Sequence, residues 1–200
     1  AALGNAAGLA GSATYVLHAM LTITGLYLVA GLLETMTGET DTRRIGGIYA
    51  AASLPSLLFF VLMLAVAGVP PFLGFWPKLL LVQGGIEAWG FGGDGWALAL
   101  WIAVLGNALL TLIAVSRLWA HIFWRAGHEG AVTEAPNPDL KPLAPRVRRL
   151  GLGTAGVLTF VVLALGLWPE PLLGFGRDAA AGLLQPANYV VATGLAGAAP

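Results

Sequence analysis

The apolar residues of this 200-residue chain are gathered into long runs, which short polar or proline-rich segments separate. Three runs, at about 12–37, 96–123 and 150–168, each approach or exceed the ~20 residues that a helix needs to cross a hydrocarbon core of ~30 Å. A further run, at about 54–86, is longer and is interrupted near 68–75. The pattern therefore predicts an all-α polytopic membrane protein with about four transmembrane spans.

The interruption in the long run is formed by Gly68, Pro70, Pro71 and Gly74. Each proline removes a backbone donor and clashes with the preceding turn, so a helix that arrives here must end or kink near the first glycine. Two arrangements fit this pattern. Either two helices cross the membrane separately, or one discontinuous span is built from two half-helices.

The distribution of basic residues favours the discontinuous span. The polar, proline-rich loop at 126–146 is flanked by arginines and contains Lys141. A single crossing puts Arg43 and Arg44 on the same side as this loop, whereas two crossings put them on opposite sides. Because cytoplasmic loops are enriched in Lys and Arg, we predict one broken span and a cytoplasmic loop at 126–146.

The two ends of the chain carry weaker patterns. Residues 1–11 are small and glycine-rich, and we expect a helix end or a connection there. Residues 172–200 are mildly amphipathic and too interrupted to span, so we expect this tail to lie along the interface or fold against a partner. The start lacks an initiator Met and a basic leader, which indicates a fragment or a processed product. We treat 1–200 as a single transmembrane domain.

Composition supports the membrane assignment. Only 10% of the residues are charged and the mean hydropathy is +0.81, whereas soluble domains carry about 25% charged residues. The absence of cysteine excludes disulfides and thiolate metal sites, and a net charge of zero gives no support for nucleic acid as a partner. The three histidines lie far apart and no hydrolase, metalloprotease or phosphate-loop motif is present. We therefore expect no enzyme active site, metal or cofactor.

Lys78 is the most informative side chain, because it lies in the apolar run directly after the break. A charge at membrane depth costs about 2.5–3.5 kcal/mol on insertion scales, so such residues usually belong to ion or proton paths. Loss of water disfavours the charged form of a lysine, which suits a proton relay. The alternative is a lysine at a helix end that extends to the interface.

His18 lies within the first span, and three other polar residues are candidates for lining a hydrated path. An imidazole can both give and accept a proton near neutral pH, although it can also simply join two helices through a hydrogen bond. Thr22 lies four residues later on the same helix face, and Thr24 is a second hydroxyl nearby. Asn107, in the middle of the third span, either bonds across helices or lines the water path.

Several stretches resemble one family of membrane proteins. The break and Lys78 lie in GVPPFLGFWPKLLLV, which resembles the signature G-[LIV]-P-P-x-x-G-F-[WF]-x-K of antiporter-like subunits. Other stretches that resemble this family are LHAMLTITGLYLVAGLLE, like its histidine-bearing helix, SRLWAHIFW, and the closing LLQPANYVVA. The family includes the proton-pumping subunits of respiratory complex I and the large subunits of multisubunit cation/proton antiporters of the Mrp type, among which the D-type is the most similar.

The resemblance implies the C-terminal part of a longer subunit, made of the second of two inverted five-helix units and a closing helix. It also implies that Lys78 carries protons and that His18 is the family's helix histidine. Two positions depart from the family pattern. Ile23 stands where D-type subunits often have a lysine, which leaves water or hydroxyls to connect the two bases. Pro77 replaces a small residue, so we expect the second half-helix to begin at the lysine.

Together these features predict a proton-translocating subunit of a multisubunit monovalent cation (Na⁺)/H⁺ antiporter in the cell (inner) membrane, with protons relayed at mid-membrane through His18 and Lys78. Its expected partners are other membrane subunits of a hetero-oligomeric complex, the lipid bilayer, protons and monovalent cations. Two alternatives stay open. One is a proton-pumping subunit of a complex I-like NADH–quinone oxidoreductase or membrane hydrogenase, and the other is a non-transporting structural membrane subunit.

Overall fold

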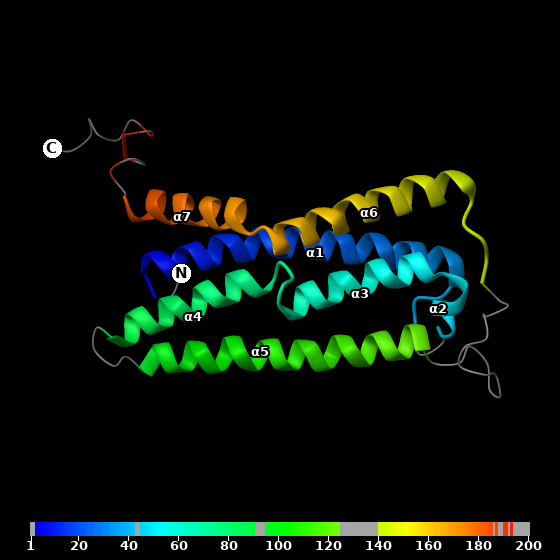
Figure 1. Ribbon diagram of the computed structural model, residues 1–200, viewed down its shortest axis with the longest axis horizontal. Helices are drawn as coiled ribbons and strands as arrows, with labels where there is room; N and C mark the ends of the chain where they lie inside the picture. The colour runs from blue at the N-terminus through cyan, green and yellow to red at the C-terminus, as the bar shows by residue number, and fades with distance from the viewer. Residues whose placement is uncertain are drawn as a thin grey trace.

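A computed structural model describes residues 3–42, 45–90, 95–124, 140–185, 187, 190–191 and 193, and the described part is almost entirely helical. Its elements are α1 (Ala6–Thr37), α2 (Ile48–Ala51), α3 (Ser53–Ala67), α4 (Phe75–Gly90), α5 (Gly95–Trp119), the π-helical turn η1 (Ala120–Trp124), α6 (Pro145–Leu167) and α7 (Glu170–Leu184). The long helices lie side by side, and α1 contacts α3, α4, α6 and α7 (Figure 1). The central helix of the bundle is therefore the one that carries His18.

Among the described residues, three helices are long and apolar enough to cross a membrane, namely α1, α5 with η1, and α6. The apolar helix α3 and the following α4 lie end to end beside α1, and together they cover the same length as the continuous helices (Figure 1). The prediction of an all-α polytopic membrane protein with one discontinuous helix is confirmed.

The first helix begins at Ala6, earlier than the apolar pattern predicts, so most of the segment 1–11 is helix rather than connection. The side chain of Asn5 caps this helix, since it accepts a hydrogen bond from the Gly8 N–H at 2.9 Å and donates to the Gly84 carbonyl at 2.7 Å. Gly8 packs directly against Gly84 of α4. The small residues at this end therefore mark close helix packing, which composition alone does not distinguish from a turn.

Helix α6 also begins earlier than predicted, at Pro145. Proline is favoured in the first helical position, because its missing N–H would have no helical partner there. Arg146, Arg148 and Arg149 consequently lie in the first turns of α6 rather than in a loop.

Most of the expected cytoplasmic loop at 126–146 lies outside the described residues, as do Arg43 and Arg44. The described end of the loop is tied to the end of α1, where the Lys141 N–H donates to the Met36 carbonyl at 2.8 Å. The cytoplasmic assignment of this end of the bundle stays a prediction.

The described part of the tail folds against this same chain. Helix α7 packs along α1, and a Cβ at Gly176 would lie 2.6 Å from Cγ2 of Thr14 and 3.0 Å from the Ala10 carbonyl oxygen. This close approach requires glycine. Most residues after Gln185 lie outside the described part of the chain.

A cluster of buried apolar side chains lies where α1, α2, α3, α6 and η1 meet. It includes Val29, Leu33, Ile48, Phe59, Leu62, Met63, Phe123 and Val162. The outer side of α5 is different, because it carries exposed Ile102, Leu105 and Leu109. Exposed apolar rows on a membrane helix suit lipid or a neighbouring subunit.

Candidate functional site

The discontinuous helix is broken at the residues that the sequence singles out. Helix α3 ends at Ala67 and is capped by Gly68, whose φ of 80° is left-handed and favours glycine. The Pro70–Pro71 peptide bond is cis, and α4 begins after Gly74, at Phe75. The chain therefore leaves one half-helix and enters the next within a few residues, and the two lie end to end.

The two prolines leave two carbonyls of α3 without their usual helical donors. In an α-helix, the carbonyl of a residue accepts the N–H of the residue four positions later. For Val66 and Ala67 these positions are Pro70 and Pro71, which have no N–H. Lys78 supplies the donors instead, since its Nζ lies 2.6 Å from the Ala67 oxygen and 3.2 Å from the Val66 oxygen. The amine thus replaces both missing backbone donors.

Lys78 lies in the first turn of α4 and points back to the end of α3, and only 7% of the residue is exposed. Helix α4 begins at Phe75, not at the lysine as expected, so Pro77 falls in the first turn. Its missing N–H has no helical partner there, which is why proline is tolerated. The amine consequently sits at the junction of the two half-helices, in the middle of the discontinuous span.

His18 approaches the same junction from α1, where it is 3% exposed. A Cβ at Gly74 would lie 2.8 Å from Cε1 and 2.9 Å from Nε2 of His18, and one at Gly68 would lie 2.7 Å from Nζ of Lys78. Each glycine of the break therefore makes room for one of the two bases. Nδ1 of His18 is buried and has no hydrogen-bond partner among the described residues. Buried polar atoms that no protein group satisfies are usually bonded to water.

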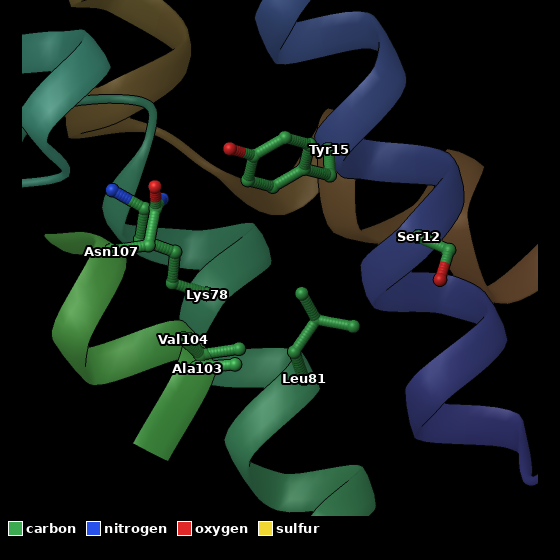
Figure 2. Close-up of a pocket in the computed structure, with 7 residues that line it drawn as sticks. All are labelled: Ser12, Tyr15, Lys78, Leu81, Ala103, Val104 and Asn107. Carbon is green, nitrogen blue, oxygen red and sulfur yellow. The ribbon is translucent and has the colours of Figure 1, made fainter. Parts of the chain in front are cut away.

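A cavity of about 330 Å³ opens beside Lys78, between α1, α4 and α5 (Figure 2). Figure 2 shows the side chains of Lys78 and Asn107 directed toward the space that the ring of Tyr15 bounds on the other side. The lining residues are Ser12, Tyr15, Lys78, Leu81, Ala103, Val104 and Asn107. The cavity has room for several waters at ~30 Å³ each, and polar side chains on its wall can hold them.

The candidate path-lining residues occupy three different environments. Asn107 lies on the cavity wall with Lys78. Thr22 is buried one turn from His18, and its hydroxyl donates to the His18 carbonyl at 2.7 Å. Thr24 is exposed on another side of α1 and is not brought together with the two bases.

Sequence reasoning missed two contributors on α1 and one contact across the bundle. Tyr15 precedes His18 by three residues, a spacing that would have placed it on the same helix face. Ser12 lies six residues before His18, so the same rule does not place it there. The indole Nε1 of Trp76 donates to the Gly166 carbonyl of α6 at 2.8 Å. No local pattern predicts that contact, because its partners are 90 residues apart.

Comparison with known proteins identifies relatives among membrane subunits of antiporters and of NADH-quinone oxidoreductases. The D-type subunit of the Na⁺/H⁺ antiporter of Bacillus subtilis (strain 168) is 28% identical over 93% of this chain and 34% of its own length. The N-type subunit of the NADH-quinone oxidoreductase of Desulforudis audaxviator (strain MP104C) is 28% identical over 92% of this chain and 34% of its own length. The chain thus spans about a third of the length of these curated relatives.

A solved structure of the Mrp complex from Dietzia sp. DQ12-45-1b contains a similar chain, with a TM-score of 0.75 and 28% identity over 96% of this chain and 40% of that one. This similarity and the apolar helices of membrane-spanning length indicate that the protein is a multi-pass protein of the cell membrane. Residues 1–120, more than half of the chain, match the family model described as "NADH:quinone oxidoreductase/Mrp antiporter, TM". The chain belongs to this NADH:quinone oxidoreductase/Mrp antiporter transmembrane family.

Proposed function

We propose that this chain is the C-terminal part of a proton-translocating membrane subunit of a multisubunit Na⁺/H⁺ antiporter, and that Lys78 and His18 carry its protons. The family and the relatives from Na⁺/H⁺ antiporters support the general assignment. The observation that carries the role of Lys78 is its buried amine, held at the break by two carbonyls that lack backbone donors. Intramembrane ionisable groups usually serve transport.

The hydrogen bonds of Lys78 are compatible with both of its protonation states. An ammonium has three N–H donors, and a neutral amine keeps two. Two donors are enough for the carbonyls of Val66 and Ala67. The third proton can therefore leave while both hydrogen bonds to these carbonyls are kept. In this proposal that proton passes to water in the cavity lined by Asn107 or toward His18, on the other side of Gly74.

The test is cation/proton exchange in vesicles that contain the intact complex. Lys78→Ala and His18→Ala should each abolish or strongly reduce exchange, because each removes a proton carrier. Lys141→Ala is the matched control. Lys141 is the second of the two lysines in these 200 residues, and it is exposed at the end of the bundle. Unchanged exchange in Lys78→Ala, with the complex intact, would contradict the proposed role.

A second candidate function is a proton-pumping subunit of a complex I-like assembly. The relative from the NADH-quinone oxidoreductase favours it, because it matches almost the same share of this chain as the antiporter relative does. The proteins that copurify separate the two candidates, because iron–sulfur subunits and quinone-dependent proton pumping are expected only for the second. Exchange that survives a double replacement of His18 and Lys78 would instead favour a non-transporting structural subunit.

The proposed partners are the other membrane subunits of the complex.

The proposed cytoplasmic end of the bundle is the one that holds Lys141 and the first turns of α6. These 200 residues contain no cysteine. A single Lys141→Cys substitution in a cysteine-free background should therefore react with a membrane-impermeant maleimide in inside-out vesicles and not in right-side-out ones. The opposite accessibility would reverse the topology.

A further inference from the structure

The end of α3 has the features of a cation site. The carbonyl end of a helix carries the negative pole of its dipole, and here two of its carbonyls lack backbone donors. In transporters with discontinuous helices, unwound carbonyls and half-helix C-termini coordinate Na⁺ or H⁺. In this structure the side-chain amine of Lys78, which is a cation when protonated, occupies that position.

We propose that the carbonyl oxygens of Val66 and Ala67 form a binding site for a small monovalent cation of the Na⁺ class, which alternates with the ammonium of Lys78. The inference rests on the proposed antiport function and specifies where the cation meets the proton carrier. When Lys78 releases one proton to water in the cavity, one N–H bond breaks and one positive charge leaves the carbonyls. A single cation then takes that place, so charge at the site is conserved.

The cavity beside Lys78 provides the access that this exchange requires. Its volume of about 330 Å³ accommodates a cation with part of its water shell, and Lys78 forms part of its wall. The Asn107 side chain carries an oxygen toward the same space, and the hydroxyl of Tyr15 lies across from it (Figure 2). The displaced amine can turn into this space, which is already next to it.

The ligands favour a monovalent cation over a divalent one. Ca²⁺ and Mg²⁺ sites in proteins rely on carboxylates. The residues that line the cavity include no Asp or Glu, and the described residues contain no group of three or more His, Cys, Asp or Glu that would hold a metal. Neutral carbonyl oxygens beside a lysine therefore suit an ion with a single charge.

The first test uses the wild-type complex and the reactivity of Lys78 itself. The purified complex is reductively methylated in NaCl or in choline chloride at equal ionic strength, and peptides with Lys78 and Lys141 are quantified by mass spectrometry. Na⁺ at the carbonyls should free the amine as a neutral nucleophile and raise its methylation by about tenfold, the effect of ~1.4 kcal/mol. Choline is too large for the site, and the exposed Lys141 should react equally in both salts. Equal methylation of Lys78 in both salts would overturn the proposal.

The second test compares two substitutions by equilibrium binding of ²²Na⁺ to the purified complex. Lys78→Met removes the competing charge and should strengthen Na⁺ binding at this site, whereas Lys78→Arg leaves a permanent charge there and should abolish it. The proposed proton role predicts loss of exchange in both variants. Exchange lost with identical Na⁺ binding in the two would refute the cation site alone, and exchange retained in Lys78→Met would refute the proton role alone.

Discussion

Replacing Gly74 by alanine should damage both the stability and the activity of the protein. The added methyl group would overlap the carbonyl oxygen of Ala65 and would lie 2.8–2.9 Å from two ring atoms of His18. The oxygen belongs to the last full turn of α3, and the ring is 3% exposed, so neither neighbour has free space to move into. The substitution must therefore shift the half-helix, the histidine or both.

The loss of stability in Gly74→Ala can be estimated from the cost of adding a methyl group where there is no free space. Inserting a methylene into a well-packed core typically costs 1–3 kcal/mol, and the two rigid neighbours put Gly74→Ala at about 2–3 kcal/mol. In the purified complex the loss should lower the thermal midpoint by less than about 2–4 °C per kcal/mol, the value for a domain of about 150–250 residues, because the unfolding unit is larger. Displacement of His18 should also slow cation/proton exchange.

The assay is thermal unfolding of the purified complex, together with exchange in vesicles. Gly31→Ala is the control, because it adds the same methyl group to α1 at a position with nothing within 4 Å. Gly31→Ala should exchange like the wild type and melt at the same or a slightly higher temperature, because alanine is favoured over glycine inside a helix. If Gly74→Ala did so too, the idea that the break is closely packed against His18 would be refuted.

Three further substitutions test individual contacts with the same thermal assay. Trp76→Phe removes the donor to the Gly166 carbonyl and should cost about 0.6–1.7 kcal/mol, the range of interhelical hydrogen bonds in membranes; an unchanged midpoint would show that this bond adds nothing. Asn5→Ala removes the cap of α1 and should cost about 1–2 kcal/mol, whereas Asn5→Ser keeps a capping oxygen; equal losses would contradict the capping role. Arg177→Gln breaks a 3.0 Å ion pair with Glu170, but both side chains are more than 60% exposed, so stability should stay within about 0.5 kcal/mol of wild type, and a larger fall would disprove this.

The break and its lysine were predictable because they depend on local chemistry. Two adjacent prolines remove two known backbone donors, so the break near Gly68 follows from the sequence alone. Counting four residues back from each proline also identifies Val66 and Ala67 as the carbonyls in need of a donor. That Lys78 meets this need depends on how the connection places the first turn of α4 against the end of α3, which no local pattern specifies.

Other features depend on contacts between distant segments. Gly8 lies in a helix and packs closely on Gly84, whereas from composition alone a glycine is also typical of a turn. Thr22 and Thr24 were treated alike, although two residues correspond to a rotation of about 200° around a helix, which separates a buried from an exposed side chain. Helix α7 is too short to be recognised as a span, and its place depends on the approach of Gly176 to α1.

The contact between Trp76 and Gly166 shows that the break between α3 and α4 lies beside the end of α6, at one level of the molecule. Helix α6 gives way to α7 directly after Gly166, and a Cβ there would lie 2.7 Å from the Pro71 carbonyl oxygen in the gap between α3 and α4. Among the described helices, α1 and α5 continue unbroken past this level (Figure 1). A bend between the two halves of the bundle would therefore be centred at this level, because hinges form at the ends of rigid elements. Lys78 and His18 both lie at this level, so a tilt there would change the distance between the two bases.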